Sequence, residues 1–379
     1  MTGLLIGAWT LLAVFSALTA IVTMLRYRPP RVPGANALPA CSVIVPIKGS
    51  SPFLARNIRN LAGIETLRGE ILLAVANDQD PALDILGRIV SEHPHKLRLL
   101  IGEASEFVNP KLRNLAKAYR ASREDLIFFF DDSVQVSPGL LSEMTDALQQ
   151  GASLITVAPI GRDVENLFGE VEAATCSYLT RIEMFLELFG AAAAFGNALA
   201  FRKADLEALG GLARLAEGPC EDNALSKAFR AAGKRVTLVR TCIGRTIGRR
   251  TWSDLYRRHL RWKNCAKCHD QAAFFIEPFI GGLCFNLLGA FSIFHTFGVS
   301  LWTAAGICLA GWYGLEALLY LVCGWQMRLI TPLAWLMRDI IHPMSTVVAL
   351  FATRVDWRGE TVEMRLTGKS EQSERAKLP

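Results

Sequence analysis

The sequence predicts an α/β domain with a mostly parallel sheet, flanked by transmembrane helices. Between residues 41 and 250, short apolar runs alternate with helical stretches, a pattern typical of βαβ units. Long apolar segments lie on both sides of that region. The apolar run Leu126 to Phe130 stops at Asp131 and Asp132, where such a sheet would bind ligands. A plain strand-end turn is nevertheless the simpler explanation of an isolated Phe-Asp-Asp.

The composition indicates a membrane protein with a globular middle. The chain has 379 residues, of which 51% are hydrophobic, and a net charge of +6. Its basic residues cluster near the apolar segments, which suits an anionic lipid surface better than nucleic acid, so no nucleic-acid partner is expected. The nine cysteines are scattered and several lie in apolar stretches. We expect them to be reduced and mostly buried.

The N-terminal segment is expected to cross the membrane once. Gly3 to Leu25 is almost uninterrupted apolar sequence, long enough for one helix. Arg26, Arg28 and Arg31 follow, and the positive-inside rule places that end in the cytoplasm. A cleaved signal peptide is the alternative, but its apolar core would be unusually long and no basic residue precedes it. A stiff, proline-rich linker over 26–40 then leads to the globular part.

The globular region is expected to alternate strands with helices. The predicted strands are Ser42 to Val45, Ile71 to Ala76, Leu97 to Ile101, Leu126 to Phe130 and Leu154 to Ala158. The predicted helices are Ala55 to Ala62, Ala82 to Glu92, Lys111 to Arg120 and Leu140 to Gln149. Neither a Gly-x-Gly-x-x-Gly run nor a Walker loop follows a strand, so neither a nicotinamide dinucleotide nor a P-loop nucleotide is expected. Leu186 to Phe201 is apolar but short, and we expect it to be buried core rather than a membrane span.

Six motifs follow one another along the chain. They are Val43 to Gly49, Asp78 to Ala82, Asn109 to Leu115, Asp131, Glu221-Asp222, and Arg258 to Trp262. In this order and spacing they resemble the ceramide glucosyltransferase family. The similarity reaches Glu277-Pro278 and Asp356 to Arg358, and so spans most of the chain. It implies a membrane-bound, inverting glycosyltransferase of GT-A fold, related to the large family 2.

The resemblance implies roles for the carboxylates. Asp222 would be the catalytic base, Asp131 would lie beside the donor diphosphate and its cation, and Asp80 would contribute to nucleotide recognition. The residues expected to bind the nucleotide sugar are Lys48, Asp78, Asp80, Lys111 and Asp131. The wider GT-A pattern is Asp-x-Asp, whereas Ser133 stands at the third position here, and ceramide glucosyltransferases also lack that Asp. Ligation of magnesium or manganese by both Asp131 and Asp132 is therefore left open.

Sugar transfer from a nucleotide diphosphate explains why these residue types are needed. Its transition state is oxocarbenium-like, and negative charge grows on the departing diphosphate, which a hard cation or cationic side chains stabilise. Asp131 and Lys111 are the candidates for that task. The acceptor hydroxyl needs a base on the opposite side of the anomeric carbon. Asp222 would precede a helix over Asn223 to Ala232, where a plain N-cap is the alternative; a helix N-terminus also favours the ionised form that a base requires.

A basic helix is predicted over Trp252 to Cys268. Its periodicity places Arg258, Arg261 and Trp262, the match to the family's (Gln/Arg)-x-x-Arg-Trp signature, on one face. A sugar and a diphosphate would meet an aromatic ring and two fixed charges there. The alternative is a juxtamembrane helix lying on anionic headgroups, because other basic residues share the segment.

Cys265 to His269 has the spacing of a c-type haem site, and Cys-x-x-Cys alone also suits zinc or a redox pair. We expect none of these. The inferred topology places the segment in the cytoplasm, and no second Cys-x-x-Cys or histidine pair completes a zinc site.

The C-terminal part returns to the membrane. Phe279 to Val299 and Leu301 to Cys323 are each long enough to span, and Leu329 to Ala352 is a third apolar segment. Arg338 and Asp339 interrupt the third segment. Ionisable residues at that depth line a cavity or pair with each other, so they are candidates for shaping a lipid headgroup entrance. An oblique, interfacial position of this segment is the alternative.

The expected protein is a multi-pass enzyme of the cell membrane with a cytoplasmic catalytic domain. Its expected parts are an N-terminal transmembrane helix (1–25), a linker (26–40), a GT-A domain (41–250), an interfacial basic helix (251–277), a C-terminal membrane region (278–352) and a polar tail (353–379). The resemblance implies glucose transfer from UDP-glucose to ceramide as a β-glycoside. Diacylglycerol or a hopanoid alcohol is the alternative acceptor. A polysaccharide synthase fits the few spans poorly, and an inactive membrane scaffold fits the intact motifs poorly.

Overall fold

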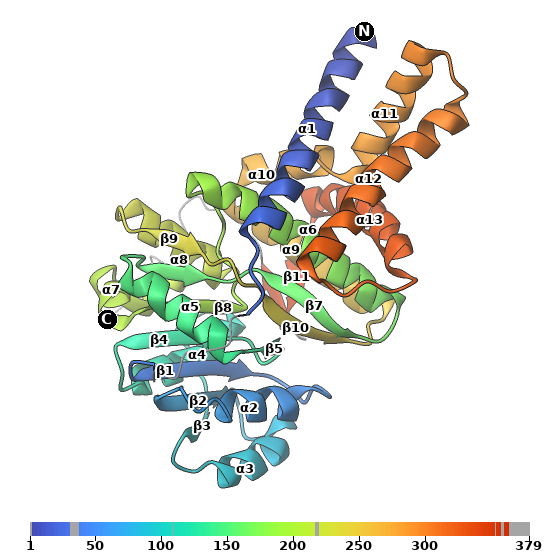
Figure 1. Cartoon of the computed structure of the whole chain (residues 1–379). Coiled ribbons are helices and arrows are strands. Elements are labelled where there is room, and N and C mark those ends of the chain that lie inside the picture. The colour runs from blue at the N-terminus through green and yellow to red at the C-terminus, as the bar shows by residue number, and fades with distance from the viewer. Residues whose placement is uncertain are drawn as a thin grey trace.

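A seven-stranded sheet, in the order β3-β2-β1-β4-β8-β6-β9, organises the lower part of the molecule in Figure 1. The computed structural model describes residues 2–30, 38–107, 109–216, 220–352, 354–357 and 360–363. The strands are β1 (Cys41–Ile47), β2 (Gly69–Val75), β3 (Leu97–Ile101), β4 (Leu126–Phe130), β6 (Leu154–Thr156), β8 (Ala198–Arg202) and β9 (Val236–Leu238). Only β8 runs antiparallel to its neighbours, β4 and β6. The predicted mostly parallel sheet is confirmed.

Helices cover both faces of this sheet. One face carries α2 (Leu54–Ala62), α3 (Ala82–Glu92) and α5 (Pro138–Gln149); the other carries α4 (Pro110–Ala121), α7 (Lys203–Ala208), the 3-10 turn η2 (Gly211–Ala216) and α8 (Glu221–Ala231). Successive strand residues serve opposite cores, since Val43 and Val45 pack in the first and Ile44 in the second. A strand buried on both faces therefore has a continuous apolar sequence. The four predicted helices are confirmed to within two residues.

The segment Leu186 to Phe201 is core only in its second half. Leu199 and Phe201, in β8, are fully buried between neighbouring strands. Leu188 and Phe189 lie in the short 3-10 helix η1 (Glu187–Phe189) and are 52% and 70% exposed. The expectation of core throughout was wrong for these residues, because the segment enters the core only from Ala192 onward.

A smaller sheet, in the order β5-β10-β7, continues beyond the end of β4. Its strands are β5 (Val134–Gln135), β7 (Pro159–Val164) and β10 (Ile243–Gly248). Helix α6 (Leu167–Leu186) packs on β7, and α9 (Trp252–His269) follows β10. The N-cap Thr251 starts α9 with a capping box, in which its hydroxyl accepts from Asp254 N and the Asp254 carboxylate accepts from Thr251 N. The predicted basic helix is confirmed. A short antiparallel ribbon, β11 (Arg354–Trp357) and β12 (Glu360–Glu363), adjoins α9.

Long apolar helices project together from the top of the molecule in Figure 1. They are α1 (Thr2–Arg26), α11 (Gly282–Phe297) and α12 (Leu301–Cys323). Within the described ranges, two helices, Gly3–Arg26 and Leu301–Cys323, are long and apolar enough to cross a membrane. A third span results if α11 is joined to Gln271–Phe279, the segment of α10 (Gln271–Ile276) and η3 (Glu277–Phe279) that meets it at a 44° bend.

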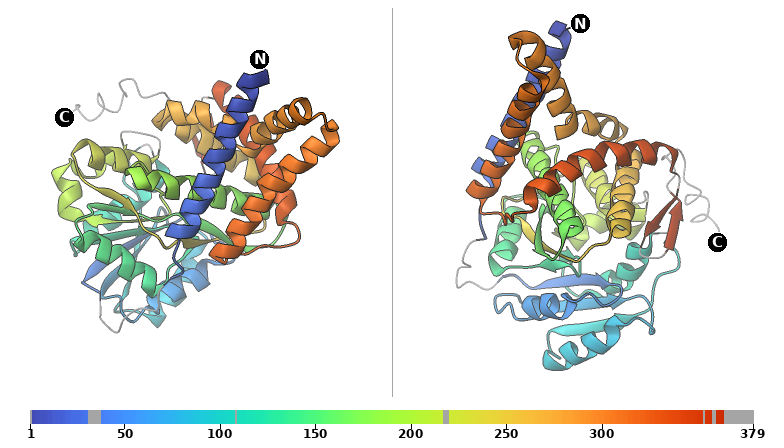
Figure 2. Two further views of the ribbon diagram at one scale, coloured as in Figure 1. Left: turned by 45° about the horizontal axis from the view of Figure 1, so that its top comes forward. Right: turned by 90° about the vertical axis from the view of Figure 1, so that its right-hand side faces the viewer.

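Helix α13 (Thr331–Phe351) lies across these helices and packs on α6 and α9 (Figure 2). Its Arg338 is fully buried and contacts the Glu316 carboxylate at 2.7 Å and the Asp339 carboxylate at 2.9 Å. Trp312 donates to Asp339 as well, at 2.9 Å. The suggestion that Arg338 and Asp339 shape a headgroup entrance was wrong, because they form an ion-paired network in the interior.

Candidate active site

A pocket of about 440 Å³ lies beyond the carboxyl ends of β1 and β4. Other parts of the chain line it as well, among them the start of α4, the loop before β8, the start of α8, the end of β10 and the middle of α9. Eight residues singled out in the sequence line it: Lys48, Lys111, Asp131, Asp132, Asp222, Arg258, Arg261 and Trp262. The pocket lies where α/β sheets generally bind ligands.

Asp78 and Asp80 are not among the residues that line this pocket. Both carboxylate oxygens of Asp80 accept from Gly49 N at 3.0 Å, and Oδ1 also accepts from Ala82 N. Gly49 has φ of +75°, a turn conformation that suits glycine, and follows the pocket residue Lys48. Asp80 therefore holds the loop that presents Lys48. A direct contact of Asp78 or Asp80 with a nucleotide stays a prediction.

Lys111 forms ion pairs with two carboxylates in the pocket. Its Nζ lies 2.8 Å from Asp131 Oδ1 and 2.8 Å from Glu221 Oε1. Burial opposes the charged form, but the two carboxylates prevail and raise the pKa of Lys111 well above its ordinary value. Asn109, the N-cap of α4, accepts from Lys111 N and donates to Glu221 Oε2 at 3.0 Å, which ties α4 to α8. Lys111 is thus a fixed cation beside the Asp131 carboxylate.

Asp222 lies in the first turn of α8. The helix begins at Glu221 with Cys220 as its N-cap, so the alternative that Asp222 is the N-cap is wrong. Asp222 Oδ2 accepts from Gly196 N at 2.7 Å, and Oδ1 accepts from Asn223 N at 2.8 Å. Burial and the neighbouring Glu221 carboxylate raise the pKa of Asp222 to about 6, against the opposing effect of Lys111.

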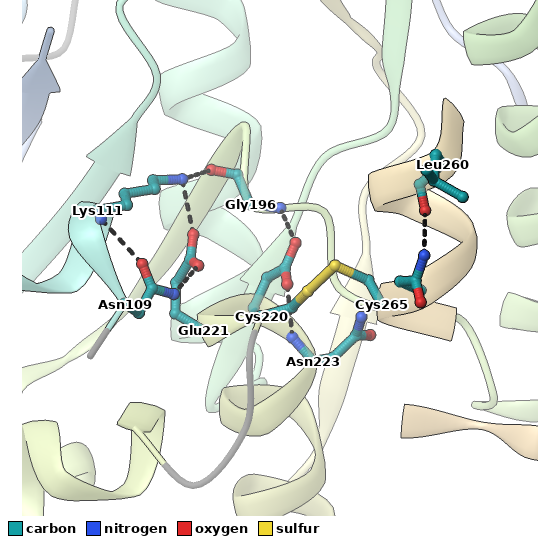
Figure 3. Close-up of a disulfide and its surroundings, with 10 residues drawn as sticks. Asn109, Lys111, Gly196, Cys220, Glu221, Asn223, Leu260 and Cys265 are labelled. Carbon is teal, nitrogen blue, oxygen red and sulfur yellow. Dashed lines mark hydrogen bonds and ion pairs between the residues drawn. A yellow bond between two sulfur atoms is a disulfide. The ribbon is translucent and has the colours of Figure 1, made fainter. Parts of the chain in front are cut away.

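The peptide groups of Gly196 link Asp222, the candidate base, to Lys111. Its N–H donates to Asp222. Its carbonyl accepts from Lys111 Nζ at 2.9 Å (Figure 3). A Cβ atom at this position would lie 2.9 Å from Asp222 Oδ2, closer than Cβ atoms ordinarily approach. The peptide of Gly196 can therefore sit against the carboxylate only because the residue has no side chain.

Five arginines also line the pocket, and together they are called the arginine wall here. Arg258 and Arg261 come from α9, as the sequence predicts. Three more come from the end of β10 and the turn after it: Arg245, Arg249 and Arg250. The guanidinium of Arg245 lies 5.8 Å from the ring centroid of Trp262. Sequence reasoning missed these three; their only signal was a basic run between a strand and a capped helix.

A disulfide between Cys220 and Cys265 crosses one side of the pocket (Figure 3). It joins the N-cap of α8 to α9. The expectation that all cysteines are reduced was wrong for this pair, because folding brings their Cα atoms to 6.2 Å, within disulfide reach. The other seven are not disulfide-bonded, and six of them are buried as expected. Cys265 therefore pairs with Cys220 rather than with Cys268.

The part of the pocket around Asp131 and Asp132 has some of the ligands that a hard cation needs. Asp131 and Asp132 both line it and offer carboxylate oxygens, the ligands that magnesium prefers. No group of three or more His, Cys, Asp or Glu side chains that could hold a metal exists among the described residues. Magnesium commonly binds one or two carboxylates and takes its other ligands from substrate phosphates and water, and this pocket offers that type of site.

Comparison with known proteins identifies the family. The family model described as Glycosyl transferase family 21 matches residues 7–370. Ceramide glucosyltransferase 1 of Caenorhabditis elegans is 22% identical over 342 residues, which cover 88% of this chain and 73% of that protein. The ceramide glucosyltransferase of Komagataella phaffii is 30% identical over 127 residues, covering 32% of this chain and 24% of that protein.

A solved structure supports the GT-A fold. The mannosyltransferase of Pyrobaculum calidifontis, determined in complex with GDP-Man and Mn2+, has a TM-score of 0.53 and 15% sequence identity. The alignment covers 92% of this chain and 98% of that protein. The chain is therefore a sugar-transferring enzyme of GT-A fold, and it belongs to glycosyl transferase family 21.

Proposed function

We propose that the protein transfers glucose from UDP-glucose to a membrane lipid hydroxyl, with ceramide as the first candidate, and forms a β-glycoside. One observation carries the proposal: Asp222, a carboxylate held by two backbone N–H groups, shares a pocket with five arginines and Lys111. Such a pocket suits an anionic leaving group at one side and a neutral alcohol at the other. The ceramide glucosyltransferase names of the relatives favour ceramide as the alcohol.

The proposed reaction is a single displacement. The acceptor hydroxyl oxygen forms a bond to the anomeric carbon while the bond between that carbon and the diphosphate oxygen breaks. Asp222 takes the hydroxyl proton; two backbone N–H groups hold its carboxylate in place in the pocket. The departing diphosphate gains negative charge, and Lys111, Arg258 and Arg261 supply fixed positive charge to it.

A divalent cation would add to this stabilisation. Asp131 and Asp132 are the residues that would hold magnesium or manganese, and a bound ion would neutralise charge on the departing diphosphate. Lys111 already provides one positive charge beside Asp131. The activity of this protein should therefore depend less on the divalent cation than the activity of an enzyme with both carboxylates of an Asp-x-Asp motif.

The helices favour an acceptor that lies in the bilayer. Helix α9, which carries Arg258, Arg261 and Trp262, leads directly into α10 and the bent pair with α11. The pocket then lies near the membrane surface, where a lipid alcohol reaches it by lateral diffusion. Arg26 and Arg28 at the end of α1 favour a cytoplasmic position of this side by the positive-inside rule, and the proposed protein is multi-pass.

The test is a grid of donors and acceptors with the purified protein in detergent or vesicles. UDP-glucose, UDP-galactose and UDP-N-acetylglucosamine are each combined with ceramide, diacylglycerol and a hopanoid alcohol, and products are identified by mass spectrometry. Glucosylceramide as the main product is expected. Transfer to diacylglycerol or the hopanoid would replace the acceptor but keep the reaction. Efficient transfer to a soluble oligosaccharide, or no turnover of any UDP-sugar, would contradict the proposal.

A further inference from the structure

Glu172 lies directly behind the arginine wall of the pocket. It comes from α6, its side chain is 0% exposed, and it does not itself line the pocket. Its Oε2 accepts from Arg250 Nε at 2.7 Å and lies 3.4 Å from Arg258 Nε. Its Oε1 lies 3.8 Å from a terminal nitrogen of Arg245. One buried carboxylate thus joins three arginines that all line the pocket.

The charges in this cluster do not balance. Three guanidinium groups with side chains 9%, 20% and 24% exposed surround a single carboxylate, which leaves an excess of two positive charges. Although burial opposes it, the attraction of Arg258, Arg245 and Arg250 lowers the pKa of Glu172 to about 2, so it stays ionised. Without it, three partly buried cations would repel one another and turn toward solvent. The excess charge faces the side where a diphosphate would bind.

We propose that Glu172 is a positioning residue for the donor diphosphate: it holds Arg245, Arg250 and Arg258 side by side on one wall of the pocket. The inference rests on the proposed use of a nucleoside diphosphate sugar. Glu172 acts only through the arginines, because no ligand in the pocket can reach a side chain that is fully buried. Its three partners come from β10, the turn after it and α9, so one carboxylate aligns elements that are separate in the sequence.

The sign of the effect separates positioning from simple electrostatics. A carboxylate that acted only through its charge would repel an anionic ligand, and its removal would tighten UDP binding. A carboxylate that positions the arginines has the opposite effect, because loss of their alignment removes charge-assisted hydrogen bonds to the phosphates. The two roles therefore predict changes of opposite sign for the same variant.

The experiment measures UDP and UMP affinity by calorimetry on full-length protein in detergent, together with KM and kcat for the donor. Glu172→Gln is expected to weaken UDP binding at least about tenfold and to raise KM more than it lowers kcat. UMP, with one phosphate fewer, should lose less affinity than UDP. Glu172→Asp, which keeps the charge, should restore part of the UDP affinity, and it carries the same test if Glu172→Gln does not fold.

Glu70→Gln is the matched control. Glu70 is also buried and accepts from Arg98 at 2.6 Å, but it lies at the amino end of β2, away from the pocket. The control should lower the melting temperature and leave UDP affinity unchanged. Unchanged or tighter UDP binding by Glu172→Gln, or equal losses for UDP and UMP, would overturn the positioning role. If the wild-type protein binds no UDP, the donor proposal itself fails, and this inference fails with it.

Discussion

Asp222 has the surroundings that a catalytic base requires near neutral pH. Two backbone N–H groups fix its carboxylate, and a glycine allows one of them to approach. Glu221, one residue earlier, instead forms an ion pair with Lys111. Two adjacent carboxylates in one helix turn therefore have different partners. Glu221 is a structural anion, whereas Asp222 is able to accept a proton.

Asp222→Asn should therefore reduce turnover by at least about 100-fold and leave UDP binding nearly intact, because the amide keeps the shape but accepts no proton. Turnover is measured as glycolipid formed, and UDP binding by calorimetry. Asp84→Asn, an exposed aspartate in the first turn of α3, is the control and should behave as wild type. Near-normal turnover of Asp222→Asn would remove the base from the mechanism.

The rate of glycolipid formation should also fall as the pH is lowered. Since the pKa of Asp222 is raised to about 6, the base is ionised above pH 6 and protonated below it. The value of kcat/KM should therefore fall about tenfold per pH unit below pH 6 and level off above it. A rate profile measured from pH 5 to pH 8 checks this. A flat profile would show that deprotonation of Asp222 does not limit the reaction.

At the residue scale, local motifs could predict the carboxylates of the pocket and its two arginines from α9. They could not predict the residues that hold these side chains in place. Asp131, Lys111 and Asp222 belong to short motifs that can be recognised in a single sequence. Glu172 and Arg245 meet only in the folded chain, 73 positions apart in the sequence. No spacing rule connects a buried carboxylate in one helix to an arginine in a later strand. Sequence reasoning therefore reached the pocket residues that belong to short motifs. It missed three arginines that line the pocket, Arg245, Arg249 and Arg250, and the carboxylate behind them.

Helices α8 and α9 form two sides of the pocket, and the Cys220–Cys265 disulfide joins them. The bond is one residue away from Glu221 and three from Trp262, so it constrains both sides near the proposed reacting groups. A cross-link over 45 positions also removes entropy from the unfolded chain.

Cys265→Ser is expected to lower turnover several-fold and to reduce the free energy of unfolding by on the order of 2–4 kcal/mol. Intact-mass analysis after thiol alkylation, with and without reductant, checks whether the bond is present. Cys268→Ser, one turn along the same helix, should resemble wild type. If wild-type protein shows nine alkylated thiols without reductant, and Cys265→Ser matches it in activity and melting temperature, the cross-link has no role.

At the element scale, the alternating apolar runs predicted five of the six parallel strands of the large sheet, all but β9, and the four helices between them, because each is a local pattern. Strand β8 and helix α6 were not predicted as elements. The residues of β8 follow a Gly- and Ala-rich apolar stretch, and only pairing with β4 and β6 makes them a strand. Helix α6 packs against β7, α1 and α13, so much of its surface is buried and its periodicity is weak.

In the whole molecule, the pocket lies beyond the carboxyl ends of β1 and β4, with residues of α8 and α9 at its sides. Its cation requirement follows from the balance of charges there. Activity should depend on magnesium or manganese but with weak affinity, because Ser133 stands where a second ligand would be and Lys111 already neutralises Asp131. The test is turnover after chelation followed by metal titration. Full activity after exhaustive chelation would show that the lysine and arginines suffice.

The sequence predicted which segments are apolar enough to span a membrane, but it did not predict how these helices pack against one another. Apolar length alone identified α1 and α12, since the bilayer sets that length. It did not predict that Arg338 pairs with Glu316, because their partnership depends on how α12 and α13 cross. Residues 31–37 of the 26–40 linker and most of the 353–379 tail lie outside the described residues, so those boundaries stay predictions.

The configuration of the new glycosidic bond tests the central claim most directly. A single displacement at the α-linked sugar of UDP-glucose, with Asp222 as base, predicts a β-linked lipid product. The measurement is the proton NMR coupling of the anomeric hydrogen in the purified glycolipid made by the wild-type enzyme. A β-glucoside is the predicted result. An α-linked product would contradict the single displacement, and glucose released to water without a lipid product would contradict the acceptor as well.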